Sequence, residues 1–345
     1  MPDNVGDFQL RFAELPLRLQ LEGFPSEIAH SIARQWLCGI RSAAGGSNAY
    51  RVRLHKEPRL RFRPPASERL QRQIRLRAST VGSTTQLRMP GTRTSFIADR
   101  PRAEIEVHPH LLRHPGMMEL AVGGALGHAL ALAGASFLHG AAVIVDDLPI
   151  LLLGEAASGK STVAAAALAA GGKVVSDDSL ILYPTASSRF GARTLRRDLF
   201  LREGSRAVLP APLQERLQRV GPAIDSRWVL GRGDAASAFR TAIEPAALCV
   251  LRRDRRLKAF RLTALNQARA LTSLLEANAS PHLLHPGFEG EQQALLSLWS
   301  RLTSTIPAFE LRLGPAVLEA PAEVLAEVVA RLQAWRADAL ASREV

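Results

Sequence analysis

The chain has 345 residues and a formal net charge of +12, with 47% hydrophobic and 22% charged residues, a balance typical of a globular protein. Its two cysteines, Cys38 and Cys249, lie far apart without partner spacing, which argues against a disulfide framework and against a zinc site built on cysteines. The N-terminus lacks the basic start and apolar core of a secretion signal, so we expect a cytoplasmic protein.

The positive charge comes mainly from arginine. Only four of the 44 basic residues are lysines, and the arginines are spread along the whole chain. A basic balance favours nucleic acid or acidic partners when it is clustered. Its even spread instead indicates a general bias of composition, so it carries little weight here.

Residues 1–110 are predicted to form a smaller N-terminal α+β module. Residues 26–39 read as a helix with Ser26 as N-cap, and residues 50–62 alternate between apolar residues and arginines, as a half-buried strand does. The segments 74–77 and 86–88 repeat this pattern. The arginine face suggests docking of an acidic peptide or of nucleic acid. Aromatic residues for base stacking are scarce, which favours a solvated strand face and makes nucleic acid an unlikely partner.

Residues 111–345 are predicted to form a second domain. The apolar stretch 117–138 has the length of a membrane span, but Glu119, His128 and four glycines interrupt it, which favours a buried helix and no membrane partner. Strand and helix patterns then alternate, as in an α/β nucleotide-binding core. The expected strands are 137–145, 149–153, 172–178, 246–252 and 309–313, and the expected helices are 163–170, 265–277 and 320–341.

The most specific motif covers residues 154–162, which match G-x-x-x-x-G-K-[ST], the phosphate-binding P-loop between a strand and a helix. Its glycines let the backbone fold around phosphate oxygens, and the loop amides and the helix N-terminus face the anion. Lys160 is expected to reach the β- and γ-phosphates, and the Ser161 hydroxyl to bind Mg²⁺. The motif therefore predicts that ATP is bound by Gly154, Glu155, Ala156, Ala157, Ser158, Gly159, Lys160, Ser161 and Thr162.

A second signal is the pair Asp177 and Asp178, at the predicted end of the strand that follows the loop helix. In P-loop folds the neighbouring strand commonly ends in an aspartate beside Mg²⁺, and phosphoryl transfer also uses a carboxylate that accepts the proton of the acceptor hydroxyl. Adjacent strand residues point to opposite sides, so both carboxylates serve the site only if the strand end is distorted. Otherwise one is functional and the other caps the turn.

Three motifs together resemble the catalytic domain of the HPr serine kinase/phosphorylase family: His139-Gly140, the loop at 154–162, and Ser176-Asp177-Asp178. The chain is most similar to an HPr-kinase-like branch associated with ribosomally made peptides, lasso peptides included. The resemblance is clear over about residues 135–185. It implies an α/β fold with a P-loop nucleotide-binding core of the HPr-kinase C-terminal-domain type.

By position, the resemblance implies that Asp177 is the general base on a serine hydroxyl and that His139, close to it, supports its basicity. It further implies that Asp178 holds Mg²⁺ together with Ser161. Lys160 completes the expected catalytic set. Without this context His139 reads as a packed residue at a strand end.

The resemblance fails at residues 194–202, which lack the Glu-x-Arg-Gly-x-Gly segment linked to the reverse phosphorylase reaction. We therefore expect a forward-only, ATP-dependent kinase acting on a serine of a protein or peptide, with the oligomeric state left open. Arginines 196, 197, 202 and 206 are candidates for phosphate contacts. The alternatives are a small-molecule kinase on the same core and a non-catalytic ATP-binding sensor or assembly protein.

Overall fold

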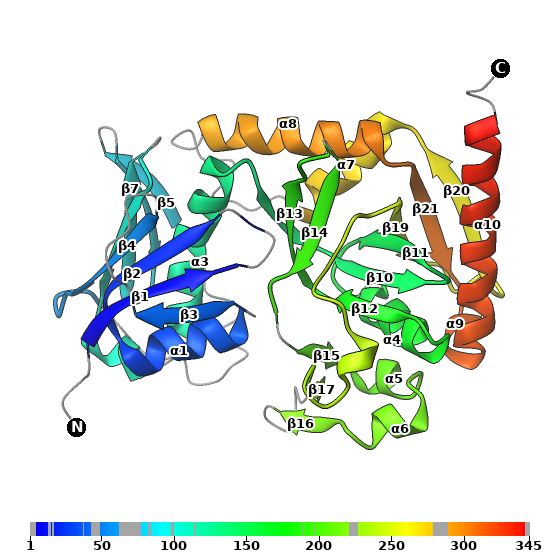
Figure 1. The fold of residues 1–345 in the computed structure, drawn as a ribbon, viewed down its shortest axis with the longest axis horizontal. Helices are drawn as coiled ribbons and strands as arrows, with labels where there is room; N and C mark the ends of the chain where they lie inside the picture. Colours follow the sequence, from blue (N-terminus) through cyan, green and yellow to red (C-terminus); the bar gives the residue numbers. More distant parts are fainter. Residues whose placement is uncertain are drawn as a thin grey trace. The chain divides into compact units, whose positions relative to one another are not determined.

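The computed structural model describes residues 5–12, 15, 17–36, 38–42, 49–61, 77–81, 84–97, 100–113, 115–187, 189–196, 198–220, 227–278 and 289–341. The chain forms two compact units, of which the first comprises Met1–Phe137 with Ala279–Leu298 and the second Leu138–Asn278 with Trp299–Val345 (Figure 1). It is an α/β protein whose mixed sheets contain parallel strands. No helix of the described residues is long and apolar enough to cross a membrane.

The first unit contains an eight-stranded sheet in the order β3-β1-β2-β4-β8-β7-β6-β5. The β2–β4 and β4–β8 pairs are parallel, and the other neighbours are antiparallel. Its elements are β1 (Val5–Arg11), β2 (Arg18–Pro25), α1 (Ser26–Gln35), β3 (Gly39–Ser42), β4 (Tyr50–Lys56), β5 (Arg77–Val81), β6 (Thr84–Met89), β7 (Thr92–Ile97), β8 (Arg102–Val107), the 3₁₀ turn η1 (Pro109–Arg113) and α3 (Pro115–Leu132).

Helix α3 packs against strands β4, β7 and β8 and against α1, so it belongs to the first unit. The sequence indicated a boundary near residue 110, whereas the contacts divide the chain after Phe137. A buried hydrogen bond joins the two helices, since Trp36 Nε1 donates to Glu119 Oε1 at 2.7 Å. The glutamate that argued against a membrane span therefore has a partner inside the unit.

Two details of the N-terminal prediction change. Helix α1 buries Ile28 and Ile32 as expected, but its N-cap is Pro25, and Ser26 is already helical. Strand β4 alternates as predicted from Tyr50 to Lys56 and then ends in a turn, while residues 62–76, including the predicted strand start at 74, lie outside the described residues.

Carboxylates cover part of the predicted arginine face of the first unit. Arg53 pairs with Glu22 at 2.8 Å, and Arg51 lies 4.0 Å from the same carboxylate. Arg93 pairs with Glu106 across β7 and β8. These exposed pairs are each worth at most ~1 kcal/mol to folding, but they lower the net positive charge of the face.

The second unit is built from many short elements. Its strands are β9 (Ser136–His139, which begins in the first unit), β10 (Ala141–Val145), β11 (Leu148–Leu153), β12 (Lys173–Ser176), β13 (Ser179–Pro184), β14 (Phe190–Thr194), β15 (Leu199–Leu201), β16 (Gln218–Val220), β17 (Arg227–Leu230), β18 (Ala242–Ile243), β19 (Ala247–Arg253), β20 (Phe260–Leu265) and β21 (Ala308–Leu313). Its helices are α4 (Lys160–Ala169), α5 (Glu203–Arg206), α6 (Ala211–Gln214), the 3₁₀ turn η2 (Ala236–Ala238), α7 (Gln267–Asn278), α9 (Ala316–Glu319) and α10 (Pro321–Ala341), together with the end of α8 (Glu289–Thr305).

The central sheet of the second unit has six strands in the order β12-β10-β11-β19-β21-β20. Strands β11, β19 and β21 are parallel, and β12 shares their direction because β10 runs antiparallel to both β11 and β12. The carboxyl ends of these four strands therefore meet at one edge of the sheet. Two smaller sheets, β18-β14-β13-β9 and β15-β17-β16, complete the fold.

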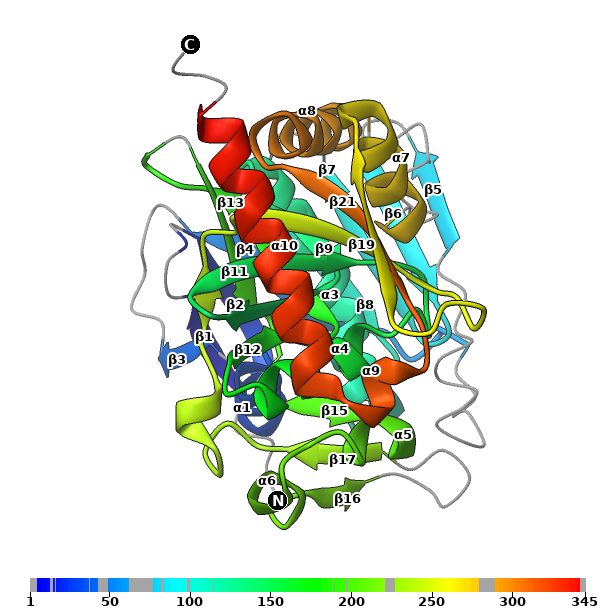
Figure 2. The same cartoon turned by 90° about the vertical axis from the view of Figure 1, so that its right-hand side faces the viewer.

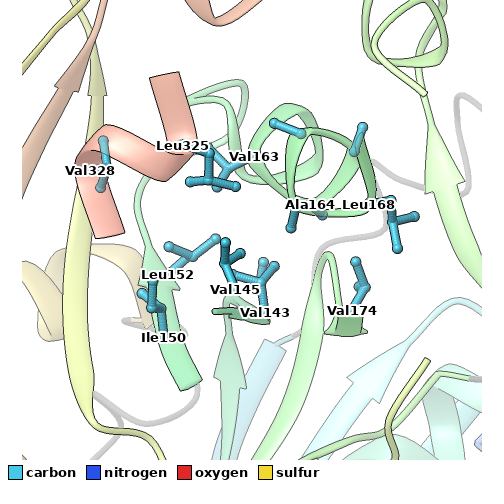
Figure 3. Packing of buried hydrophobic residues seen from close by; sticks show 14 of the residues in the cluster. Val143, Val145, Ile150, Leu152, Val163, Ala164, Leu168, Val174, Leu325 and Val328 are labelled. Atoms are coloured by element: carbon cyan, nitrogen blue, oxygen red, sulfur yellow. The ribbon is translucent and has the colours of Figure 1, made fainter. Parts of the chain in front are cut away.

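Helices α4 and α10 cover one face of this sheet (Figure 2). Figure 3 shows Leu325 of α10 and Val163 of α4 facing Leu152 of β11, within one buried hydrophobic cluster. Each fully buried Leu or Val side chain contributes ~1.5–3 kcal/mol relative to exposure, so this cluster fixes α4 on the sheet. Helix α7 contacts β11 and β21, and its buried Ala270 and Leu274 lie outside the cluster, so it covers the opposite face.

Candidate active site

The sequence-predicted site residues come together at the carboxyl-terminal edge of the six-stranded sheet. The loop 154–159 follows β11 and leads into α4, and the two aspartates follow β12. His139 and Gly140 precede β10, which starts at the same edge because it runs antiparallel to both strands. In parallel α/β sheets, ligands bind at this edge.

The loop has a backbone conformation that requires glycine. Gly154 has a φ of 145° and Gly159 a φ of 112°, both in the region that favours glycine. A Cβ on Gly154 would lie 2.6 Å from Ser158 Oγ and 2.8 Å from the Leu251 carbonyl oxygen, so only glycine fits there. Ala157 also has a positive φ, of 65°, a strain worth ~1–3 kcal/mol that commonly occurs at functional sites. The loop is therefore shaped at the expense of local stability.

Lys160 is the first residue of α4, and its side chain is buried. The ammonium donates to two carbonyls of its own loop, Gly154 O at 2.6 Å and Glu155 O at 3.1 Å. Burial lowers the pKa of Lys160, and the nearby charges of Asp178 and Asp177 oppose this shift. The ammonium therefore already lies inside the loop, where phosphate oxygens can replace the carbonyls as its partners.

Asp177 is 4% exposed, and the Ser161 hydroxyl donates to its Oδ2 at 3.3 Å. Burial raises the pKa of Asp177 to about 7, and the charge of Asp178 adds to the effect. This side chain therefore changes its charge near neutral pH. A carboxyl group with such a pKa is suited to accept and release a proton during catalysis.

Asp178 has the opposite electrostatics. Its Oδ1 lies 3.2 Å from Nδ1 of His139, and both side chains are about half exposed, at 54% and 42%. The contact with His139 lowers the pKa of Asp178 to about 2. Asp178 is thus a permanent anion at neutral pH.

These contacts differ from the pairing that the family resemblance implies. There His139 lies close to the first aspartate and Ser161 acts with the second; here His139 contacts Asp178 and Ser161 contacts Asp177. The reason is the turn after β12, where Ser176 Oγ accepts from the backbone amides of Asp178 and Ser179 at 3.3 and 3.1 Å. This turn ends the strand geometry, so both aspartates line one cavity although they are adjacent in sequence.

Backbone hydrogen bonds hold the segment of His139 independently of its imidazole. The His139 amide donates to Asn278 Oδ1 at the end of α7 at 2.5 Å, and the Gly140 amide donates to the Asp178 carbonyl at 3.0 Å. Gly140 also approaches β11 closely, because a Cβ there would lie 2.9 Å from the Leu152 carbonyl oxygen. The β9–β10 junction is therefore fixed directly to the aspartate pair.

Three cavities surround the loop. The largest of the three has a volume of about 470 Å³, and its lining includes His139, Lys160, Ser161, Asp177 and Asp178, so we name it the aspartate cavity. The other two, of about 350 and 300 Å³, lie between the loop and the segment after β21, and between the loop and α7. Thr162, predicted to bind the cofactor, lines two of them, while its hydroxyl contacts Ser205 Oγ at 3.0 Å.

Seven further residues line the aspartate cavity and were not chosen from the sequence, although Arg202 was considered: Phe200, Arg202, Gly204, Ser205, Arg227, Arg253 and Leu318. Arg253 ends β19, the parallel neighbour of β11, and lines all three cavities. The available signal was the pair Arg252 and Arg253 at the end of the predicted strand 246–252. Arg197 lies outside the described residues.

Among the described residues, no group of three or more His, Cys, Asp or Glu side chains forms a metal site. Mg²⁺ usually binds through one or two carboxylates together with substrate phosphates and water. Asp178 and the Ser161 hydroxyl supply ligands of this kind at one cavity. These residues therefore fit Mg²⁺ that arrives with a nucleotide.

The buried Asp177 predicts a pH-dependent difference in stability. An unfolded Asp has a pKa near 3.8, and the value for Asp177 in the folded protein is about 7. The contribution of Asp177 to stability is therefore fully present below about pH 4 and is lost as the pH rises through about 7. We expect Asp177→Asn to raise the free energy of unfolding at pH 8 by up to about 4 kcal/mol, with little effect at pH 4, in urea titrations. Asp178→Asn is the control. The pKa of Asp178 is lowered in the folded protein, so its charge stabilises the fold at neutral pH and its removal should not raise the free energy of unfolding at about pH 8. An increase equal to that of Asp177→Asn contradicts the prediction.

Comparison with known proteins finds no family model that matches the chain and no curated protein that matches it. The fold and the site define the class: an α/β protein with a glycine-containing loop and a pair of aspartates at the carboxyl-terminal edge of its mixed sheet.

Proposed function

We propose that this protein is an ATP-dependent kinase with a P-loop core of the HPr-kinase type, which transfers the γ-phosphoryl group to a serine of a protein or peptide. One observation carries the proposal: Asp177, with a pKa of about 7, lies beside Ser161 and lines the same cavity as Lys160 of the glycine-rich loop. The loop supports the nucleotide-binding part of the proposal. The adjacent carboxylate supports transfer to a hydroxyl, because a protein that only bound the nucleotide would need no proton acceptor there.

The loop supports the nucleotide half of the reaction. Gly154 leaves the space that a Cβ would fill, and Ser158 Oγ beside it is buried without a hydrogen-bond partner among the described residues. The loop amides, the N-terminus of α4 and Lys160 would hold the phosphates. Bound Mg²⁺ would neutralise the charge that develops on them.

The aspartate pair supports the acceptor half. Asp177 would orient the acceptor hydroxyl and take its proton, since its pKa is close to the working pH. Asp178 would contribute to the metal site as a permanent anion, and His139 would hold it there through their 3.2 Å contact. His139 thus acts on Asp178 in this proposal, not on Asp177.

Two observations bear on the identity of the acceptor. A serine hydroxyl is supported by the resemblance of the three motifs to the HPr kinase family. A small-molecule acceptor is the second candidate, because the aspartate cavity, at about 470 Å³, falls in the size range of ~300–1,000 Å³ that small-molecule sites occupy.

Incubation of the purified chain with γ-labelled ATP and Mg²⁺ in an extract of its source cells separates the functions. Label on a protein or peptide as phosphoserine is the expected result. Label confined to small molecules favours the second candidate. Binding of ATP without transfer to any acceptor overturns the kinase and leaves a non-catalytic sensor or assembly protein.

A further inference from the structure

The cavity between the loop and the segment after β21 is mainly apolar, and we name it the base cavity. Its volume is about 350 Å³, and its walls include Leu313, Pro315, Val317 and Leu318, with Arg253 and Arg255 among its polar lining. The loop side is formed by Ser158, Gly159 and Thr162. An apolar cavity next to an anion-binding loop is the arrangement that a nucleotide requires, since its base is apolar and its phosphates are charged.

Arg253 connects this cavity to the phosphate positions. Its Nε lies 3.8 Å from where a Cβ on Gly159 would be, so the guanidinium lies against the loop. The neighbouring Arg252 and Arg312 both pair with Glu310, whereas no carboxylate among the described residues pairs with Arg253. The charge of Arg253 is therefore available for an anion on the loop.

The order of the strands sets a direction for the ligand. The aspartates follow β12 at one side of the loop, and the base cavity follows β21 at the other, with β10, β11 and β19 between. A phosphate chain whose terminal group faces the aspartates therefore extends toward β21. The cavity beside α7 is less suitable for a base, because charged residues, among them Arg252 and Glu276, line it.

We infer that a purine nucleoside triphosphate binds with its phosphates along the loop against Arg253 and its base in the base cavity. A guanidinium can stack on the base, and the aliphatic side chains enclose it. Among the described residues, no Asp, Glu, Asn or Gln side chain lines the base cavity, where it would read the hydrogen-bonding edge of the base. ATP and GTP therefore bind about equally well. This inference rests on the proposed nucleotide-dependent function.

The test measures binding of ATP, GTP and inorganic tripolyphosphate, each with Mg²⁺, by calorimetry. In the wild-type chain we expect similar dissociation constants for ATP and GTP, within about three-fold, and weaker binding of tripolyphosphate, which lacks a base. Arg253→Ala is expected to weaken all three ligands by about ten-fold or more. Leu318 is half-exposed and lines both the base cavity and the aspartate cavity, and its apolar side chain makes no hydrogen bond to phosphate. Leu318→Asn is therefore expected to weaken ATP and GTP by about five-fold but tripolyphosphate by less than about two-fold.

Arg256→Ala is the matched control, because Arg256 is exposed, lies three residues from Arg253, and lines none of the three cavities described. It should leave all three dissociation constants unchanged.

The inference is overturned if Arg253→Ala behaves like Arg256→Ala, if Leu318→Asn weakens tripolyphosphate as much as ATP, or if ATP binds at least ten-fold more tightly than GTP. Kinase activity together with any of these outcomes leaves the proposed function in place. The expected binding pattern without phosphoryl transfer supports the inference and overturns the kinase, and no binding by the wild-type chain overturns both.

Discussion

Replacing Lys160 by alanine is expected to lower the rate of phosphoryl transfer by about a hundred-fold or more. The reason is its position, because the ammonium is held inside the loop on the carbonyls of Gly154 and Glu155 and is partly stripped of water. A charge in a dry, preorganised site stabilises developing phosphate charge far more than the same charge in water. The measurement is initial rates with γ-labelled ATP at saturating Mg²⁺.

Lys258→Ala is the matched control for this variant, since Lys258 is an exposed lysine that lines none of the described cavities. Both variants should keep the far-ultraviolet circular dichroism of the wild-type chain. Full activity of a folded Lys160→Ala protein would remove the loop from the reaction. An equal loss of activity in Lys258→Ala would mean that the rate depends on the net charge of the protein and not on the position of Lys160 in the loop.

The two aspartates are expected to have separable effects. Asp177→Asn should lower kcat by about a hundred-fold to ten-thousand-fold, because it removes the proton acceptor, and should leave the Mg²⁺ concentration for half-maximal activity nearly unchanged. Asp178→Asn should raise that Mg²⁺ concentration, because it removes a permanent anion. The measurement is kcat as a function of Mg²⁺ for the three proteins.

The pH dependence of kcat shows which of the two aspartates is the proton acceptor. The wild-type rate should rise with pH to a plateau above about 7, where Asp177 has lost its proton. Since the charge of Asp178 raises the pKa of Asp177, Asp178→Asn should shift this rise to lower pH. A rise that moves to higher pH in Asp178→Asn, or a raised Mg²⁺ requirement in Asp177→Asn alone, means that the two carboxylates have exchanged roles.

The strand, loop and helix around residues 148–169 could be predicted closely from the sequence, because each motif position has a local physical requirement. Gly154 must avoid a Cβ, and the apolar residues of β11 must fill the core. The paired strands β14 and β18, the small sheet β15-β17-β16 and the helix α8 were not predicted. These strands have only two to five residues and gain their stability from neighbours distant in sequence.

The members of the site could be predicted, but their pairing could not. Ser176 was noted only as part of a motif, yet its hydroxyl organises the turn that brings both aspartates to one cavity. A sequence pattern gives the order of side chains along the chain but not the turn conformation that sets their directions. Arg253 illustrates the same limit, since its relation to the loop depends on the parallel pairing of β19 with β11.

The attachment of the β9–β10 junction has a consequence for how this site can change. The amides of His139 and Gly140, not the imidazole, anchor this segment to α7 and to the Asp178 carbonyl. Position 139 can therefore exchange its side chain without altering the scaffold, provided that position 140 stays glycine. The pKa of Asp178 can thus be changed through this one neighbouring side chain while the backbone framework around the aspartates stays the same.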